Sequence, residues 1–261
     1  MSPTLKSLSS KDFSKRSAKD NDINLVVNCA AYTNVELAES NIEECFNVNY
    51  EGVKNLVNAL ERNQGSLIHI STDYVFNGKG NIPYSENNSV SPINMYGKSK
   101  ADGENAIITS SIPFVIIRTS WLYSRFGQNF MKLVINKLDS GEELNIIGDQ
   151  VGSPTNAHDL ASYILKVINK MDESNVLIRE LIHFSNSGQI SWFDFANEIK
   201  KLRGSNTKIN KIKTSDIKFR AQRPKFSVLD TKKAKNFLSC EINDWKYSLS
   251  KCYQLYLDIE K

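Results

Sequence analysis

The sequence predicts an α/β protein built on a doubly wound parallel sheet. Short apolar runs rich in β-branched residues alternate with longer segments of helical periodicity, which is the pattern of βαβ units. Small or polar clusters lie at the carboxyl ends of three of these runs, at Cys29–Thr33, Ser71–Tyr74 and Thr119–Trp121. Because ligands bind at the carboxyl ends of parallel strands, we expect these clusters to meet at one site.

The elements are expected in an alternating order. Strands are predicted at 25–31, 66–75, 113–119 and 143–147, and helices at 36–62, 96–110 and 129–138. The first strand ends in small side chains, which allow close approach of a ligand. The first helix carries one apolar face.

The character of the sequence changes at about residue 150. We expect a helix at 158–171, a strand at 181–184, a helix at 191–202 with Ser191 as its N-cap, and a loop at Ala221–Pro224. A second, smaller lobe is therefore predicted to begin there.

The composition is that of a globular protein without a membrane span. Of the 261 residues, 40% are hydrophobic and 24% charged. No apolar stretch approaches the roughly 18–20 residues that span a bilayer, and the N-terminus is polar, so we expect a cytoplasmic protein. Four scattered cysteines and three histidines show no metal-ligand spacing, and the cysteines are interpreted as buried hydrophobic residues in a reducing compartment.

A basic segment lies between Lys200 and Lys235, with thirteen Lys or Arg residues against two acids. A solvated surface and an anion-binding site are both compatible with it. Few aromatic residues interleave with the charges, so nucleic acid is not the expected partner.

A phenol and an ammonium group lie four residues apart, at Tyr96 and Lys100, on one face of a predicted helix. Together with the hydroxyl and carboxyl groups of Ser71, Thr72 and Asp73, they could exchange a proton with a carbonyl or alcohol oxygen. Such a set requires a hydride donor to reduce a carbonyl. The sequence nevertheless contains no glycine before Gly52, where a phosphate-binding turn would be expected.

Six segments in the same order resemble the dTDP-4-dehydrorhamnose reductase family of the extended short-chain dehydrogenase/reductase superfamily. They are Asn28–Thr33, Ile70–Phe76, Tyr96–Lys100, Arg118–Trp121, Asp149–Thr155 and Ala221–Pro224. The resemblance covers about residues 20–235. It implies a Rossmann-like domain at 1–149 that binds NAD(P), lacking its first βαβ strands, and a mainly substrate-binding lobe at 150–261.

The resemblance implies reduction of dTDP-4-dehydro-L-rhamnose to dTDP-L-rhamnose with NADPH or NADH, in the synthesis of cell-surface polysaccharide. Tyr96 would protonate the C4 oxygen, and Lys100 would stabilise the phenolate and hold the nicotinamide ribose. Thr72 would polarise the carbonyl. Asn49 would support a proton relay, or would be a helix residue satisfied by neighbouring backbone.

Further contacts are implied by the same resemblance. The cofactor would contact Ala30, Ala31, Tyr32, Thr33 and Ser71 in addition to Tyr96 and Lys100. The nucleotide-sugar would contact Thr72, Asp73, Trp121, Gln150 and Arg223, of which Arg223 would pair with the diphosphate. Trp121 is alternatively a core aromatic. Glu104 is expected to be an exposed helix residue, with pairing to Lys98 or Lys100 as the alternative. Some relatives use magnesium at a dimer contact, but no cluster here supports it; a homodimer is compatible with the sequence.

The N-terminus departs from the family pattern. The family's first strand, glycine-rich turn and second strand have no counterpart, and serines at Ser7–Ser10 stand where relatives carry an acidic residue near the adenine. We expect either an N-terminally truncated reductase or a protein that has lost cofactor binding. Two other functions stay open: a non-catalytic protein like the regulatory subunit of methionine adenosyltransferase, and a different nucleotide-sugar reductase or epimerase.

Overall fold

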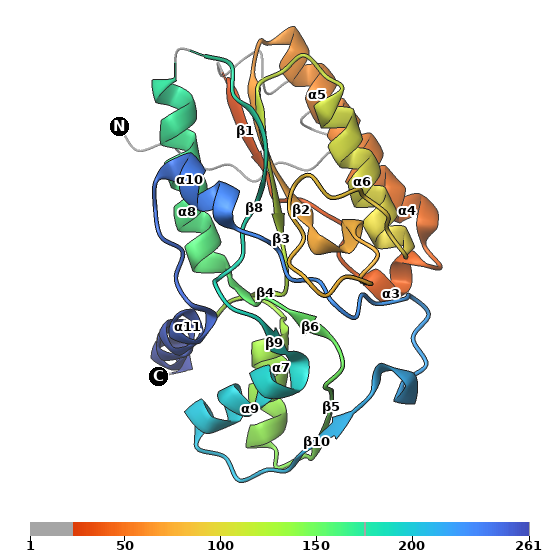
Figure 1. The fold of residues 1–261 in the computed structure, drawn as a ribbon, viewed down its shortest axis with the longest axis vertical. Coiled ribbons are helices and arrows are strands. Elements are labelled where there is room, and N and C mark those ends of the chain that lie inside the picture. Colours follow the sequence, from red (N-terminus) through yellow and green to blue (C-terminus); the bar gives the residue numbers. More distant parts are fainter. Residues whose placement is uncertain (1–22, 175, 261) are drawn as a thin grey trace.

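A four-stranded parallel sheet forms the centre of the molecule (Figure 1). The computed structural model describes residues 23–174 and 176–260. Within them the strand order is β1 (Leu25–Asn28), β2 (Ser66–Thr72), β3 (Phe114–Thr119) and β8 (Arg179–His183). The predicted parallel sheet is therefore confirmed. Its first three strands are formed by the first three apolar runs of the sequence.

Helices cover both faces of this sheet, as a doubly wound fold requires (Figure 1). Helices α5 (Gly52–Arg62) and α6 (Met95–Ile108) pack on one face, and α8 (Ala157–Glu173) and α10 (Lys232–Leu238) on the other. Successive strand residues alternate between the two: Leu67 is buried under α5 and α6, whereas Ile68 is buried under α8.

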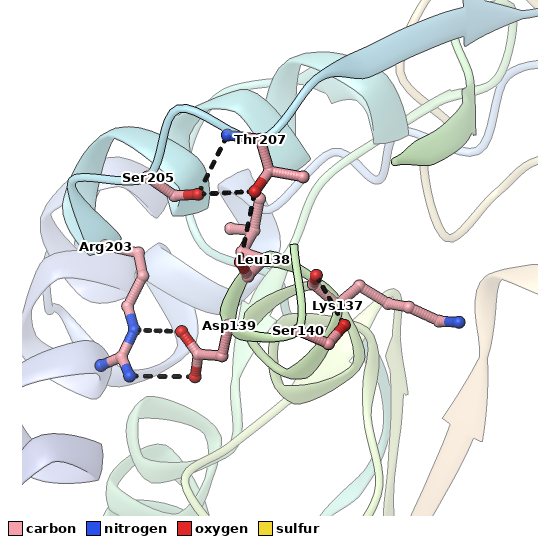
Figure 2. A network of polar contacts seen from close by, with 7 residues as sticks. All are labelled: Lys137, Leu138, Asp139, Ser140, Arg203, Ser205 and Thr207. Atoms are coloured by element: carbon pink, nitrogen blue, oxygen red, sulfur yellow. Dashed lines mark hydrogen bonds and ion pairs between the residues drawn. The ribbon is translucent and has the colours of Figure 1, made fainter. Parts of the chain in front are cut away.

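A second cluster of elements lies below the carboxyl end of the sheet in Figure 1. It contains α7 (Phe130–Asp139), α9 (Trp192–Arg203), α11 (Trp245–Glu260) and the parallel pair β5 (Leu144–Ile147) and β10 (Ile209–Ile212), followed by a 3₁₀ turn at Thr214–Asp216. Ser191 caps α9 as predicted. Figure 2 shows how α7 and α9 are tied at their ends: Arg203 makes two hydrogen bonds to Asp139, and Thr207 donates one to the carbonyl of Leu138.

The chain does not divide at residue 150 into two packing units. The strand that we placed in the smaller lobe is β8, which pairs with β3 in the main sheet because its apolar residue Ile182 is buried there. Conversely, α7 and β5 precede residue 150 but pack in the second cluster. Two short pairs join the clusters: β4 (Leu122–Tyr123) with β7 (Thr155–Asn156), and β6 (Val151–Gly152) with β9 (Ile190–Ser191).

Three predicted elements have clearly different bounds, and the first of them, the strand expected at 25–31, ends at Asn28. The helix expected at 36–62 is divided into α3 (Val35–Ala38), α4 (Ile42–Phe46), a π-helical turn (Asn47–Glu51) and α5. The strand expected at 66–75 ends at Thr72, because the Thr72 hydroxyl accepts a hydrogen bond from the Tyr74 amide and starts a 3₁₀ turn at Asp73–Val75.

The sequence predicts that the serines at Ser7–Ser10 take the place of an acidic residue that lies near the adenine in the family. These positions lie outside the described residues. In the part of the chain that the structure describes, no helix is long and apolar enough to cross a membrane.

Candidate active site

The start of helix α6 is pressed against the turn that follows strand β2. Asn94 caps the helix by accepting a hydrogen bond of 2.8 Å from the Gly97 amide. A Cβ atom on Gly97 would lie 2.2 Å from the carbonyl oxygen of Tyr74, so only glycine fits at this contact. The close approach brings Tyr96 to the end of β2.

Thr72 and Tyr96 are in contact there. The Thr72 hydroxyl acts on the Tyr96 phenol, and Thr72 donates a hydrogen bond of 3.2 Å to Asp73. Burial raises the pKa of the Tyr96 phenol above its ordinary value of 10, although the Thr72 hydroxyl partly opposes this. The phenol therefore keeps its proton near neutral pH and is suited to donate it.

Lys100 lies one turn after Tyr96 and is almost completely buried. Its Nζ donates a hydrogen bond of 2.7 Å to the carbonyl of Ile70 and lies 3.2 Å from Nε2 of His69. Burial lowers the pKa of the amine to about 8, and the nearby Glu104 carboxylate opposes the decrease. The structure thus brings Lys100, Tyr96 and Thr72 together at the carboxyl end of β2.

At the same end of β2, Asp73 and Ser71 each place a side-chain oxygen that lacks a hydrogen-bond partner within the described part of the chain. Among the described residues, Ser71 Oγ and Asp73 Oδ2 are buried and have no hydrogen-bond partner. Burial raises the pKa of Asp73 to about 7, although the neighbouring Ser227 and Thr72 hydroxyls lower it. Buried polar atoms of this kind are expected where a ligand completes the hydrogen bonding.

Asn49 holds the backbone that follows β1. Its Oδ1 accepts a hydrogen bond of 2.8 Å from the Tyr32 amide, and its Nδ2 donates bonds of 3.0 Å to the Tyr32 carbonyl and the Ser99 hydroxyl. The side chain thereby connects the Ala30–Thr33 segment to α6. The local interpretation of Asn49 fits this geometry, and the proton relay stays a prediction.

Trp121 lies at the end of β3 in a left-handed backbone conformation, with φ of 48°. Its ring stacks on Trp192, with 3.5 Å between the ring centroids. Gly152 makes room for the stack, since a Cβ atom there would lie 2.5 Å from the Trp121 ring. Sequence analysis did not identify Trp192. The available signal was a tryptophan directly after the N-cap Ser191.

Arg223 and Gln150 are held by different parts of the chain. Arg223 makes an ion pair of 2.8 Å with Glu36 of helix α3, stacks over Phe219 and is one-quarter exposed. Gln150 is buried and donates a hydrogen bond of 3.1 Å to Thr214. The pairing of Arg223 with Glu36 was not anticipated from the sequence.

The segment after β1 offers an open surface to a flat group. Ala30 and Thr33 are exposed, and Ala31 and Tyr32 are partly exposed. The contact of this segment with the nicotinamide and its ribose stays a prediction. The described residues contain no glycine-rich turn for a pyrophosphate. Among those same residues, no group of three or more His, Cys, Asp or Glu side chains could hold a metal ion.

A parallel sheet with helices on both faces, and a threonine, tyrosine and lysine at its carboxyl end, is the arrangement of an extended short-chain dehydrogenase/reductase. Comparison with known proteins narrows this class. The family model described as the RmlD substrate binding domain matches residues 7–257. The chain therefore belongs to the dTDP-4-dehydrorhamnose reductase family.

Individual relatives agree with this membership. The dTDP-4-dehydrorhamnose reductase of Sinorhizobium fredii is 36% identical over 237 residues, which cover 89% of this chain and 80% of the relative. The crystal structure of the Clostridium acetobutylicum reductase superposes with a TM-score of 0.85 at 35% identity, covering 94% of this chain and 84% of that one. The Bacillus anthracis reductase in complex with NADP gives a TM-score of 0.85 at 32% identity, covering 94% and 83%.

Proposed function

We propose that this chain reduces dTDP-4-dehydro-L-rhamnose to dTDP-L-rhamnose with NADPH or NADH, in the synthesis of nucleotide-sugars for cell-surface polysaccharide. The observation that carries the proposal is the placement of the Thr72 hydroxyl, the Tyr96 phenol and, one helical turn further on, the buried Lys100 amine at the carboxyl end of β2. Membership of the reductase family supports the choice of substrate, and the NADP complex of the Bacillus anthracis relative supports the choice of cofactor.

The residues of this chain would divide the reaction between them. Thr72 orients the C4 carbonyl by a hydrogen bond to its oxygen, and Tyr96 donates the proton that completes the alcohol. Lys100 supplies positive charge near the phenolate that remains. Asp73 and the Trp121 ring contact the sugar, Gln150 the nucleotide-sugar, and Arg223 the diphosphate.

The cofactor supplies the hydride when it is bound. Ala30, Ala31, Tyr32, Thr33 and Ser71 would hold its nicotinamide half, next to Tyr96 and Lys100. Asn49 keeps the Tyr32 backbone in place for this contact.

The proposal is tested by following NADPH or NADH oxidation by the purified chain with dTDP-4-dehydro-L-rhamnose, with Tyr96→Phe as the matched control. We expect oxidation that requires the keto-sugar and is lost in the control. Binding of dTDP-rhamnose without turnover would instead favour a non-catalytic protein of this fold. Faster turnover of a UDP- or GDP-keto-sugar would favour a different nucleotide-sugar reductase. The homodimer and the cytoplasmic location stay predictions.

A further inference from the structure

His69 is a buried histidine between two polar side chains of the active-site region. It lies in β2, its side chain is inaccessible to solvent, and it points to the face covered by α6. Its Nδ1 lies 3.0 Å from Nδ2 of Asn28, and its Nε2 lies 3.2 Å from Nζ of Lys100. The three side chains form a line that crosses from β1 through β2 to α6. None of them has a role in the proposed reaction except Lys100.

The hydrogen bonds in this line depend on one another. Asn28 Oδ1 accepts a hydrogen bond of 3.1 Å from the Ala30 amide, so its Nδ2 faces His69 and donates to Nδ1. A neutral imidazole that accepts at Nδ1 carries its proton at Nε2. This proton then points at Lys100, and only a neutral amine can accept it.

The charged form of Lys100 requires the opposite arrangement. An ammonium group has three donors and no acceptor, so Nε2 of His69 must accept and Nδ1 must carry the proton. The Asn28 amide must then present Oδ1 to Nδ1, which removes the acceptor of the Ala30 amide. The alternative of a charged imidazolium is disfavoured, because burial and the neighbouring Lys100 both lower the pKa of His69 well below 6.5.

We propose that His69 is a positioning residue for Lys100 and that its tautomer follows the charge on the Lys100 amine. The imidazole carries the Nδ1 proton while Lys100 is an ammonium, and the Nε2 proton once Lys100 has lost one proton to its surroundings. His69 stays neutral throughout, so the net change is the single proton of Lys100. Its Nε2 is the second acceptor, beside the carbonyl of Ile70, that fixes the direction of the ammonium group.

Other ionisable groups around Lys100 act on its charge but do not replace His69. The Glu104 carboxylate on the same helix raises the pKa of Lys100, but it is itself held by Arg118. Cys29 after β1 and Cys45 of α4 contribute less. Because Asn28 connects His69 to the Ala30 amide, the charge on Lys100 is coupled to the segment proposed to hold the cofactor.

The test is to read the tautomer of His69 directly. The chain has only three histidines, so ¹⁵N-histidine labelling with long-range ¹H–¹⁵N correlation resolves each ring, and His158→Gln and His69→Gln provide the assignments. The pKa of Lys100 is about 8. We therefore expect the Nδ1–H tautomer at about pH 6 and the Nε2–H tautomer at about pH 10. In Lys100→Met the Nε2–H tautomer should persist at both values.

A His69 that becomes an imidazolium at about pH 6, or keeps one tautomer at both pH values in the unmodified chain, would overturn the proposal. These readouts need no turnover, so they are independent of the proposed reaction.

A second measurement keeps the test independent of the Lys100 variant. The titration of ¹³C-labelled lysine gives the pKa of Lys100 in His69→Gln and His69→Leu. We expect a lower pKa in His69→Leu, which removes an acceptor from the ammonium, and a return toward the original value in His69→Gln. An unchanged pKa in His69→Leu would show that His69 does not act on Lys100. The connection to catalysis rests on the proposed function, where the same variants should shift the pH profile of keto-sugar reduction.

Discussion

The guanidinium of Arg118 makes two hydrogen bonds, of 2.9 and 2.6 Å, to the carboxylate of Glu104. Both side chains are buried. Arg118 belongs to β3 and Glu104 to α6, so the pair fixes the helix that carries Tyr96 and Lys100 to the centre of the sheet. The sequence interpretation placed Glu104 at an exposed position and was wrong, because its partner is distant along the chain.

Breaking this pair should destabilise the fold. Arg118→Met leaves the Glu104 carboxylate buried without its cation, and we expect a loss of about 3–5 kcal/mol in the free energy of unfolding. Urea denaturation measures the loss. The double variant Arg118→Met, Glu104→Leu removes both charges and should lose less. A double variant less stable than Arg118→Met would contradict this account.

Tyr96→Phe should remove the proton donor without removing the site. We expect kcat to fall by about 10²–10⁴-fold, because general acid catalysis is lost. The affinity for dTDP-rhamnose, measured by calorimetry, should change little since the ring remains. Activity close to that of the unmodified chain would rule out Tyr96 as the acid.

Asp73 should make stability fall as the pH rises. Its pKa is about 7 in the folded protein and near 3.8 when unfolded, so between these values the unfolded chain releases the proton first. The carboxyl therefore costs no stability below about pH 4, and its cost grows to a maximum above about pH 7, at about 1.4 kcal/mol per unit of pKa difference. Unfolding of Asp73→Asn and the unmodified chain across this range should show a difference that increases with pH. A constant difference would contradict the raised pKa.

Arg223 should be needed for the diphosphate. Arg223→Lys keeps the charge but loses bidentate bonding, and we expect the affinity for dTDP to fall by about tenfold, equivalent to about 1.4 kcal/mol. The exposed neighbour Lys225 provides the control, since Lys225→Met removes a positive charge from the same segment. An unchanged affinity in Arg223→Lys together with a loss in Lys225→Met, measured by titration at one salt concentration, would indicate only a general effect of charge.

Much of the main sheet could be predicted because its signals are local. The runs at 25–31, 66–75 and 113–119 each identify a strand from a few adjacent residues, and Thr72, Tyr96 and Lys100 lie in short motifs. The structure brings these three together as expected. The helix expected at 36–62 is interrupted between α3 and α4, and Asn49 in the π-helical turn bonds the Tyr32 backbone; helical periodicity indicates neither feature.

Other features depend on contacts between distant residues. Trp192 stacks on Trp121, and Glu36 pairs with Arg223, only after the fold brings remote segments together. The place of β8 in the main sheet could not be predicted for the same reason. An apolar strand sequence shows that a strand is buried, but it does not show which strand it pairs with. The pairing partner of β8 and the contacts between these remote side chains could therefore be known only from the structure.

The path of the chain has a consequence for how the protein can be divided. It leaves the main sheet to form α7 and β5, returns for α8 and β8, leaves again for α9 and β10, and returns for α10 before ending in α11. A fragment cut at any one residue within this path would leave at least one cluster incomplete. We therefore expect both clusters to melt in a single cooperative transition, and halves produced separately to regain structure only when mixed.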